Sequence, residues 1–289
     1  MNFILATDST CDLSKDMVKS LDIAMCDLLY YVDDVEYGKD ESTSLEFHEF
    51  YEKMRNGART STSMVNEDTA RAFLTELLKE GKDILYLAFD SALSGTYDNF
   101  VKIAKELNET SSNKIAVVDS LCAAGGEGLY VTLVDEKRKS GASFEETCKY
   151  AEEVRHRIMH YFIVDDLKYL ARGGRLSKGS AFVGNIINIK PVLHVDPVGK
   201  LVPFKKVFGR KKSIKVLLEK MIERYNGESK HVYISHGDCY DEAKSLADAV
   251  KEKFDLDATL IPLDYVIGSH SGPGTLTLFF TGNDRAEKD

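Results

Sequence analysis

The sequence predicts an α/β fold. In the first 160 residues, short apolar runs that end in small or polar residues alternate with segments whose apolar residues recur at helical spacing. Such alternation is typical of a largely parallel sheet with helices packed on its faces. After about residue 160 the pattern changes to one that predicts a mixed or antiparallel sheet with helices. At 289 residues the chain is long enough for two domains.

The N-terminal elements follow from these patterns. Strands are expected at residues 3–7, 84–89 and 115–118. Apolar residues recur at helical spacing over 66–80, and Gly81 follows as a stop signal. A further helix is expected directly after Ser94-Gly95-Thr96. We therefore expect residues 1–159 to form a Rossmann-like domain with a largely parallel sheet.

The second half has a different order of elements. The expected elements are a strand at 161–164, an apolar helix or turn at 182–189, a hairpin of 191–195 with 201–207, and a helix at 214–225. A strand, a helix and two more strands then reach Gly282. We expect a mixed or antiparallel α/β domain over 160–283, followed by a frayed tail over 284–289.

Composition and charge narrow the function classes. The 47 acidic residues outnumber the 38 Lys and Arg, so the surface as a whole repels nucleic acid and anionic membranes. The longest apolar runs, such as 84–89 and 276–280, are far below the ~20 residues of a membrane helix. No secretory leader is recognisable, and the five cysteines form no CxxC pair. We expect reduced thiols and a cytoplasmic protein.

Two hydroxyl-rich segments are candidates for an anion site. Ser94-Gly95-Thr96 stands where a buried strand passes into a helix, and hydroxyls with free N–H groups at a helix N-terminus favour an anion. The alternative is a simple helix cap. Thr60-Ser61-Thr62-Ser63 is expected in the loop before the next helix, where it either faces the same crevice or is merely solvated.

A single histidine stands in a glycine-rich segment near the C-terminus. His270 is expected in a turn between two apolar strands. Glycines there allow close backbone approach, and an imidazole can hydrogen-bond an oxyanion or titrate near neutrality. The alternative is a structural histidine with an ordinary hydrogen bond.

Two basic segments stand out from the acidic average. Arg172 and Arg175 flank a Gly-Gly pair, and residues 200–224 hold nine Lys or Arg. Each segment is either a solvated face or a local docking or phosphate-steering patch. The chain lacks a Walker ending, a GxGxxG after a strand, and the glycine before the serine in a nucleophile elbow. His156 and His160 have metal-ligand spacing without a third ligand, so no metal is expected.

A series of short motifs adds a resemblance. In chain order they are Thr7-Asp8-Ser9-Thr10-Cys11-Asp12-Leu13, Leu93-Ser94-Gly95-Thr96-Tyr97, Val118-Asp119-Ser120, Asp166-Leu167-Lys168-Tyr169-Leu170, Gly173-Gly174-Arg175, Ile189-Lys190-Pro191 and Gly268-Ser269-His270-Ser271-Gly272-Pro273-Gly274. Together they resemble the DegV family of fatty-acid-binding proteins, which includes the acyl-carrier subunit of bacterial fatty acid kinase. The set covers nearly the whole chain.

The resemblance implies a carrier, not an enzyme. One long-chain fatty acid, such as palmitate, stearate or oleate, would lie between the domains with its chain in an apolar tunnel. By motif match, Thr60 and Ser94 would bond the carboxylate and His270 would complete the network. Residues beside the head group, or at a docking surface, would be Ser61, Gly95, Arg172 and Arg175. A separate ATP-dependent kinase subunit would phosphorylate the carboxylate, without a cofactor, nucleic acid or stable membrane insertion.

Two departures from the family pattern and two alternative functions complete the expectations. The usual Thr-Ser-Gln-Pro-Ser loop is Thr60-Ser61-Thr62-Ser63-Met64 here, and Phe208 replaces an arginine common in relatives. The residues themselves leave open a serine-dependent acyl hydrolase with Ser94 as nucleophile and His270 as base, and a nucleic-acid role for 200–224. The expected tunnel lining is Phe182, Val183, Ile186, Ile187, Leu193, Leu276, Leu278 and Phe280.

Overall fold

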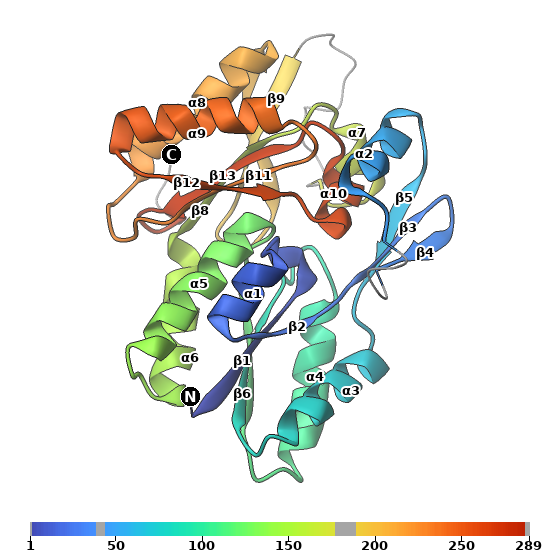
Figure 1. Ribbon diagram of the computed structural model, residues 1–289, viewed down its shortest axis with the longest axis vertical. Helices are drawn as coiled ribbons and strands as arrows, with labels where there is room; N and C mark the ends of the chain where they lie inside the picture. The colour runs from blue at the N-terminus through green and yellow to red at the C-terminus, as the bar shows by residue number, and fades with distance from the viewer. Residues whose placement is uncertain (1, 39–43, 177–188, 287–289) are drawn as a thin grey trace.

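The computed structural model describes residues 2–38, 44–176 and 189–286. Two lobes are stacked along the long axis, each built around its own sheet (Figure 1). The lower lobe holds a four-stranded sheet in the order β2-β1-β6-β7, and the upper lobe a six-stranded sheet in the order β10-β9-β8-β13-β11-β12. The predicted two-domain α/β architecture is confirmed.

The four-stranded sheet is parallel throughout. Its strands are β1 (Phe3–Asp8), β2 (Ala24–Cys26), β6 (Asp83–Ala88) and β7 (Ile115–Asp119). The apolar residues of β1 alternate between two cores, one formed with α3 (Glu67–Leu78) and α4 (Thr96–Asn108). The other core contains α1 (Lys15–Leu21), α5 (Gly125–Lys139) and α6 (Phe144–Val154). Burial on both faces explains why these strands are continuous apolar runs.

The six-stranded sheet is mixed. Its strands are β8 (Ile158–Ile163), β9 (Ile189–Val195), β10 (Leu201–Phe208), β11 (Val232–His236), β12 (Ala258–Pro262) and β13 (Leu276–Thr281). The pairs are antiparallel except β11 with β12. Two helices, α8 (Arg210–Arg224) and α9 (Tyr240–Phe254), cover one face, and the other face is turned toward the lower lobe.

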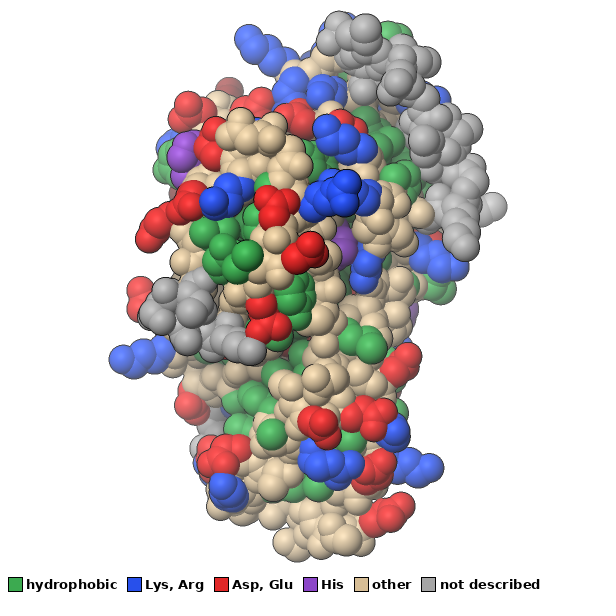
Figure 2. Space-filling model, turned by 90° about the vertical axis from the view of Figure 1, so that its right-hand side faces the viewer, with side chains coloured by type: hydrophobic (Ala, Val, Ile, Leu, Met, Phe, Trp, Pro, Cys, Tyr) green, Lys and Arg blue, Asp and Glu red, His purple; other side chains and the backbone are tan. Residues whose placement is uncertain are grey.

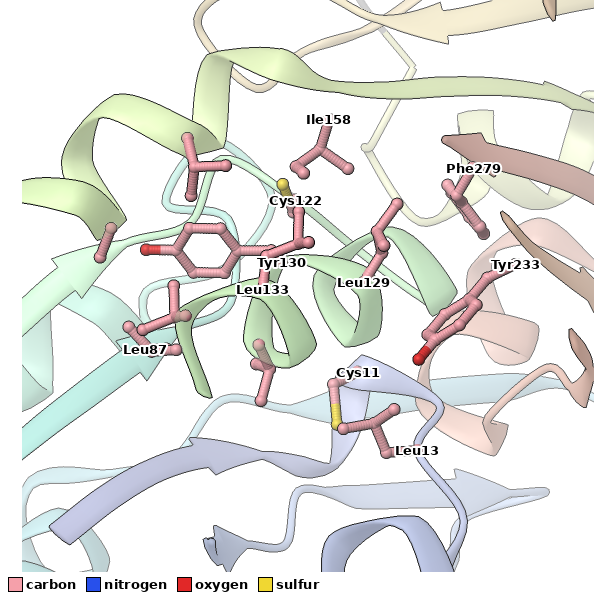
Figure 3. Packing of buried hydrophobic residues seen from close by; sticks show 14 of the residues in the cluster. Cys11, Leu13, Leu87, Cys122, Leu129, Tyr130, Leu133, Ile158, Tyr233 and Phe279 are labelled. Carbon is pink, nitrogen blue, oxygen red and sulfur yellow. The ribbon is translucent and has the colours of Figure 1, made fainter. Parts of the chain in front are cut away.

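Helix α5 joins the two lobes. Figure 3 shows its Leu129 and Tyr130 in one cluster with Leu87 of the parallel sheet and with Tyr233 and Phe279 of the mixed sheet. The helix approaches the mixed sheet closely at its N-terminus, because a Cβ atom on Gly126 would lie only 2.2 Å from Nε2 of His160. A glycine is therefore required at this contact.

A third, smaller sheet lies beside the junction of the lobes. It contains β4 (Val35–Tyr37), β3 (Leu29–Val32) and β5 (Thr60–Ser63), and α2 (Phe47–Arg55) packs nearby. Helix α10 (Tyr265–Ser271) contacts both β5 and α7 (Lys168–Arg172). Two expectations were wrong here. Residues 60–63 form a strand instead of a loop, and His270 lies on a helix instead of in a turn.

Near the last described residue, the side chain of Arg285 ties the chain to three other segments. Arg285 is buried and donates hydrogen bonds to the carbonyl oxygens of Leu121, Arg155 and Asp196. The expectation of a frayed tail from residue 284 is therefore wrong for Arg285. Residues 182–188 of the expected apolar helix or turn lie outside the described residues. Among the described residues, no helix is long and apolar enough to cross a membrane.

Candidate functional site

A narrow cavity lies where the two lobes and the small sheet meet. Water-sized molecules have access to a volume of about 80 Å³. Its mouth is the part where polar wall residues are half-buried instead of buried, among them Thr62, Ser94, Arg175 and His270. Thr62 is bonded to His270, and Arg175 to the carbonyl oxygen of Leu93, next to Ser94. The four residues come from β5, the segment before α4, the segment after α7, and α10. Segments that are far apart in the sequence therefore place their polar side chains at one end of the cavity.

His270 is held by contacts on both sides of its ring. Its Nε2 lies 2.7 Å from Oγ1 of Thr62. On the other side, a Cβ atom at Gly173 would lie 2.3 Å from Nδ1, so the backbone after α7 presses against the ring. Burial, together with the charges of Arg175 and Arg172, lowers the pKa of His270 to about 4. The imidazole is therefore neutral at pH 7.

Ser94 both lines the cavity and supports helix α4. Its Oγ lies 3.0 Å from Oγ1 of Thr96 and accepts a 3.3 Å hydrogen bond from the Thr96 amide. Gly95 is the N-cap residue of α4. The two interpretations of this motif are thus compatible, because a hydroxyl that stabilises the first turn is also exposed on the cavity wall.

The two arginines have different positions. Arg175 is half-buried on the cavity wall, where its Nε donates to the Leu93 carbonyl at 3.1 Å and its Nη1 to the Gly173 carbonyl. Arg172 is exposed, with its guanidinium 5.4 Å from the centre of the Tyr169 ring. Arg175 is therefore the one that supplies a fixed positive charge at the mouth.

The hydroxyl groups of strand β5 and the residues after it have different surroundings. Thr60 Oγ1 donates a 2.8 Å hydrogen bond to the carbonyl oxygen of Ser269, and Ser61 is exposed. Thr62, Ser63 and Met64 line the cavity instead. Sequence reasoning missed Thr62 and Met64, although both belong to the segment that departs from the family pattern. The sequence Thr60-Ser61-Thr62-Ser63 has no alternation of apolar and polar residues, so no local signal could have revealed the position of Thr62.

The interior of the cavity is apolar. Phe89, Leu93, Phe162, Val195 and Phe279 line it. The hydroxyls of the wall residues Ser271, Thr275 and Thr277 donate to protein carbonyl oxygens, namely those of Ile267, Gly272 and Ser235. These polar groups therefore need no partner from a ligand, and the interior suits a hydrocarbon.

Part of the expected tunnel lining was wrong by one residue. Leu276, Leu278 and Phe280 point to the opposite face of β13, into the core under α8 and α9, whereas Thr275, Thr277 and Phe279 line the cavity. Leu193 packs with the wall residues Phe162 and Val195 without lining the cavity itself. Phe182, Val183, Ile186 and Ile187 lie outside the described residues.

The catalytic pair of an acyl hydrolase is not assembled within the described residues. The Ser94 hydroxyl is bonded to Thr96, and Nε2 of His270 is bonded to Thr62. A nucleophile and its base should be within hydrogen-bond distance of each other. The geometry therefore gives the hydrolase alternative no support.

One group of side chains outside the cavity has metal-like spacing. His48, Glu52 and Asp238 bring ligand atoms within 4.8 Å of one another, which makes them the one such group in the described part of the chain. Arg55 donates hydrogen bonds to Glu52 and to Asp238, so the carboxylates already have a cationic partner.

On the face shown in Figure 2, Lys and Arg side chains are interspersed with Asp and Glu.

The fold and the cavity define a class of protein, namely a two-lobed α/β protein whose interlobe cavity has a polar mouth and an apolar interior. Residues 2–283 match a family described as uncharacterised protein, DegV family. The chain belongs to the DegV family, as the motifs predicted.

Individual relatives are similar over nearly their full length. A DegV domain-containing protein of Clostridium perfringens is 41% identical, with 98% of each chain covered. A protein of Thermotoga maritima named fatty acid-binding protein is 32% identical, with 96% of each covered. The solved structure of a fatty-acid-binding DegV family protein from Thermus thermophilus has a TM-score of 0.86 at 28% identity, covering 98% of this chain and all of that one.

Proposed function

We propose that this protein binds one long-chain fatty acid in the interlobe cavity and presents its carboxylate to a separate kinase. The observation that carries the proposal is that Thr62, Ser94, Arg175 and His270 converge at the mouth of a cavity whose remaining wall is mainly apolar, with the hydroxyls of Ser271, Thr275 and Thr277 bonded within the protein. A fatty acid has the same division, with one anionic end and a long hydrocarbon. The fatty-acid-binding relatives support the same ligand class.

The head-group site has donors suited to a carboxylate. With the proton of the neutral His270 on Nε2, the ring donates to Thr62, and the Thr62 hydroxyl is then free to donate to the ligand. Ser94 offers a second hydroxyl, and Arg175 a positive charge on the cavity wall. Charge-assisted hydrogen bonds of this kind are stronger than neutral ones and favour the ionised carboxylate. Thr60 and Gly95 then act through the backbone of Ser269 and the start of α4.

The acyl chain supplies most of the favourable free energy. Each buried methylene group contributes about 0.8 kcal/mol, so a chain of palmitate, stearate or oleate length offsets the cost of ordering the ligand. Slow release follows, because dissociation returns the hydrocarbon to water. Under the proposal, a partner protein acts on the exposed head group while the chain stays bound.

The second part of the proposal is the transfer step. A kinase subunit with its own ATP site would phosphorylate the bound carboxylate to an acyl phosphate in the cytoplasm, with Arg172 and Ser61 on the exposed surface beside the mouth. Incubation of the loaded protein with ATP alone should give no acyl phosphate. Addition of a bacterial fatty acid kinase subunit should give a product that hydroxylamine traps as the hydroxamate. No product with the kinase would contradict the presentation role.

The binding step has a direct test. The full chain is purified without added ligand and denatured, and the released lipid is identified by mass spectrometry. We expect close to one fatty acid per protein, with much less in Ser94→Ala and His270→Ala. Absence of lipid, together with no uptake of offered palmitate, stearate or oleate, would overturn the proposed function.

A further inference from the structure

A second cavity shares part of its wall with the first. Water-sized molecules have access to about 420 Å³ in it, and its walls include Tyr161, Phe204 and Arg285. The two cavities share two wall residues, His160 of β8 and Val195 of β9. Both residues are buried, so their side chains form a partition between the two cavities at a part of the first cavity away from solvent.

The His160 side of this partition is rigid. The ring is 2% exposed, its Nδ1 lies 3.0 Å from the Ile158 carbonyl oxygen, and Nε2 accepts a 3.4 Å hydrogen bond from the Ala123 amide. The edge-on Phe279 ring is centred 5.1 Å away, and Gly126 lies against Nε2. Contacts on several sides leave the imidazole no room to move aside.

The Val195 side is formed by the last residue of β9. Val195 is 3% exposed and packs with Phe162, Leu193 and Leu201, three residues on the same face of the sheet. Its methyl groups are the part of the partition that a conservative substitution can shorten or extend. Val192, on the same strand, is fully buried but packs on the opposite face, under α8.

We propose that His160 and Val195 stop the methyl end of the acyl chain and thereby set the longest fatty acid that the protein accepts. The inference rests on the proposed function, because the donors at the mouth fix the carboxylate at one end. The distance from that fixed point to the partition then measures the chain. The second cavity is the space that becomes available when the partition is cut back.

Length profiles of Val195 variants test this rule. Delipidated protein is titrated with saturated fatty acids from twelve to twenty-two carbons, and the affinity for each length is measured. In Val195→Ala, we expect about a tenfold gain for acids two carbons longer than the wild-type optimum, the effect of burying two more methylene groups. In Val195→Phe, the optimum should move to shorter chains.

Val192→Ala is the matched control, since it removes the same atoms from the same strand without touching the cavity. It should keep the wild-type profile. If Val195→Ala or Val195→Phe fails to fold, Val195→Leu replaces it, because Leu extends the side chain only modestly. Unchanged optima in all folded Val195 variants that still bind fatty acid would overturn the length rule. Failure of the wild-type protein to bind any length would instead overturn the proposed function on which the rule rests.

Discussion

Thr62 Oγ1 lies 2.7 Å from His270 Nε2, although the two residues are 208 positions apart in the chain. The hydrogen bond joins strand β5 to helix α10 at the mouth of the cavity. The ring is neutral at pH 7, so only one of its two nitrogens carries a proton. If the Thr62 hydroxyl donates its proton to a ligand, it must accept one from His270, and the proton of the ring is then on Nε2. Thr62 is therefore expected to contribute directly to ligand binding.

Thr62→Val tests this contribution with a side chain of nearly the same shape. We expect the affinity for palmitate to fall about tenfold, because one hydrogen bond to a charged group is lost. Displacement of a fluorescent fatty acid measures the change. Ser61→Ala, on an exposed residue of the same strand, should bind like the wild type. Equal affinities for the two variants would remove Thr62 from the site.

Ser94→Ala distinguishes a binding role from a nucleophilic one. We expect reduced fatty acid binding and no measurable ester hydrolysis by either the wild type or the variant. The assays are lipid uptake and the release of p-nitrophenol from an acyl ester. Ser91→Ala is the control, since Ser91 is exposed and nearby in sequence. Hydrolysis that is present in the wild type and Ser91→Ala but lost in Ser94→Ala would establish the hydrolase alternative.

Arg175→Met tests the source of positive charge at the mouth. The wild type should bind a fatty acid more tightly than the fatty alcohol of the same length, because only the acid has an anionic end. We expect Arg175→Met to lose most of this preference. Arg172→Met should keep it, since the Arg172 side chain is exposed and does not line the cavity. Titration calorimetry with matched acid and alcohol gives the comparison.

A pair of carboxyl groups at the lobe interface predicts a pH dependence of stability. Asp12 Oδ1 accepts a 2.9 Å hydrogen bond from the amide of Asp264, which caps α10. Burial raises the pKa of Asp12 to about 7, and burial with the neighbouring Asp12 raises that of Asp264 to about 8. Between the ordinary carboxyl pKa near 4 and these values, the folded state holds protons that the unfolded state has lost. This contribution to stability is therefore present at low pH and disappears as the pH rises through 7 to 8.

Asp12→Asn removes one of these titrations while keeping a side-chain oxygen that can accept the Asp264 amide. Urea unfolding at pH 5 and pH 8.5 measures the free energy of unfolding. We expect the variant to lose less stability than the wild type across this interval, by on the order of 2 kcal/mol. Asp16→Asn, at an exposed carboxylate on α1, should behave like the wild type. An identical pH dependence in Asp12→Asn and the wild type would contradict the assignment.

Periodicity alone placed three of the four strands of the parallel sheet and two of the helices packed on it, but not α5, the helix that joins the lobes. The strands expected at 3–7, 84–89 and 115–118 agree with β1, β6 and β7 to within a residue or two at each end. The helix after Asn66 starts where predicted, since the Asn66 side chain accepts a hydrogen bond from the Thr69 amide. These features depend on residues that are close in the sequence, so a local sequence pattern can predict them.

Helix α10 shows a local signal that was overlooked. Asp264 accepts hydrogen bonds from the amides of Val266 and Ile267, and Gly272 ends the helix with a φ of +85°. An acidic cap followed eight residues later by the glycine that ends the helix indicates a short helix. The glycines around His270 outweighed that signal in the sequence interpretation and favoured a turn.

Thus the sequence by itself determined the fold class, part of the order of elements and the family, because hydrophobic periodicity, caps and ordered motifs are properties of neighbouring residues. Only the tertiary structure decided which face of β13 lines the cavity, because both faces of Leu276–Thr281 are buried and alternation cannot tell one core from the other. It also decided that Thr62 meets His270 and that His160 and Val195 stand between the two cavities, since these positions bring together residues from distant parts of the chain.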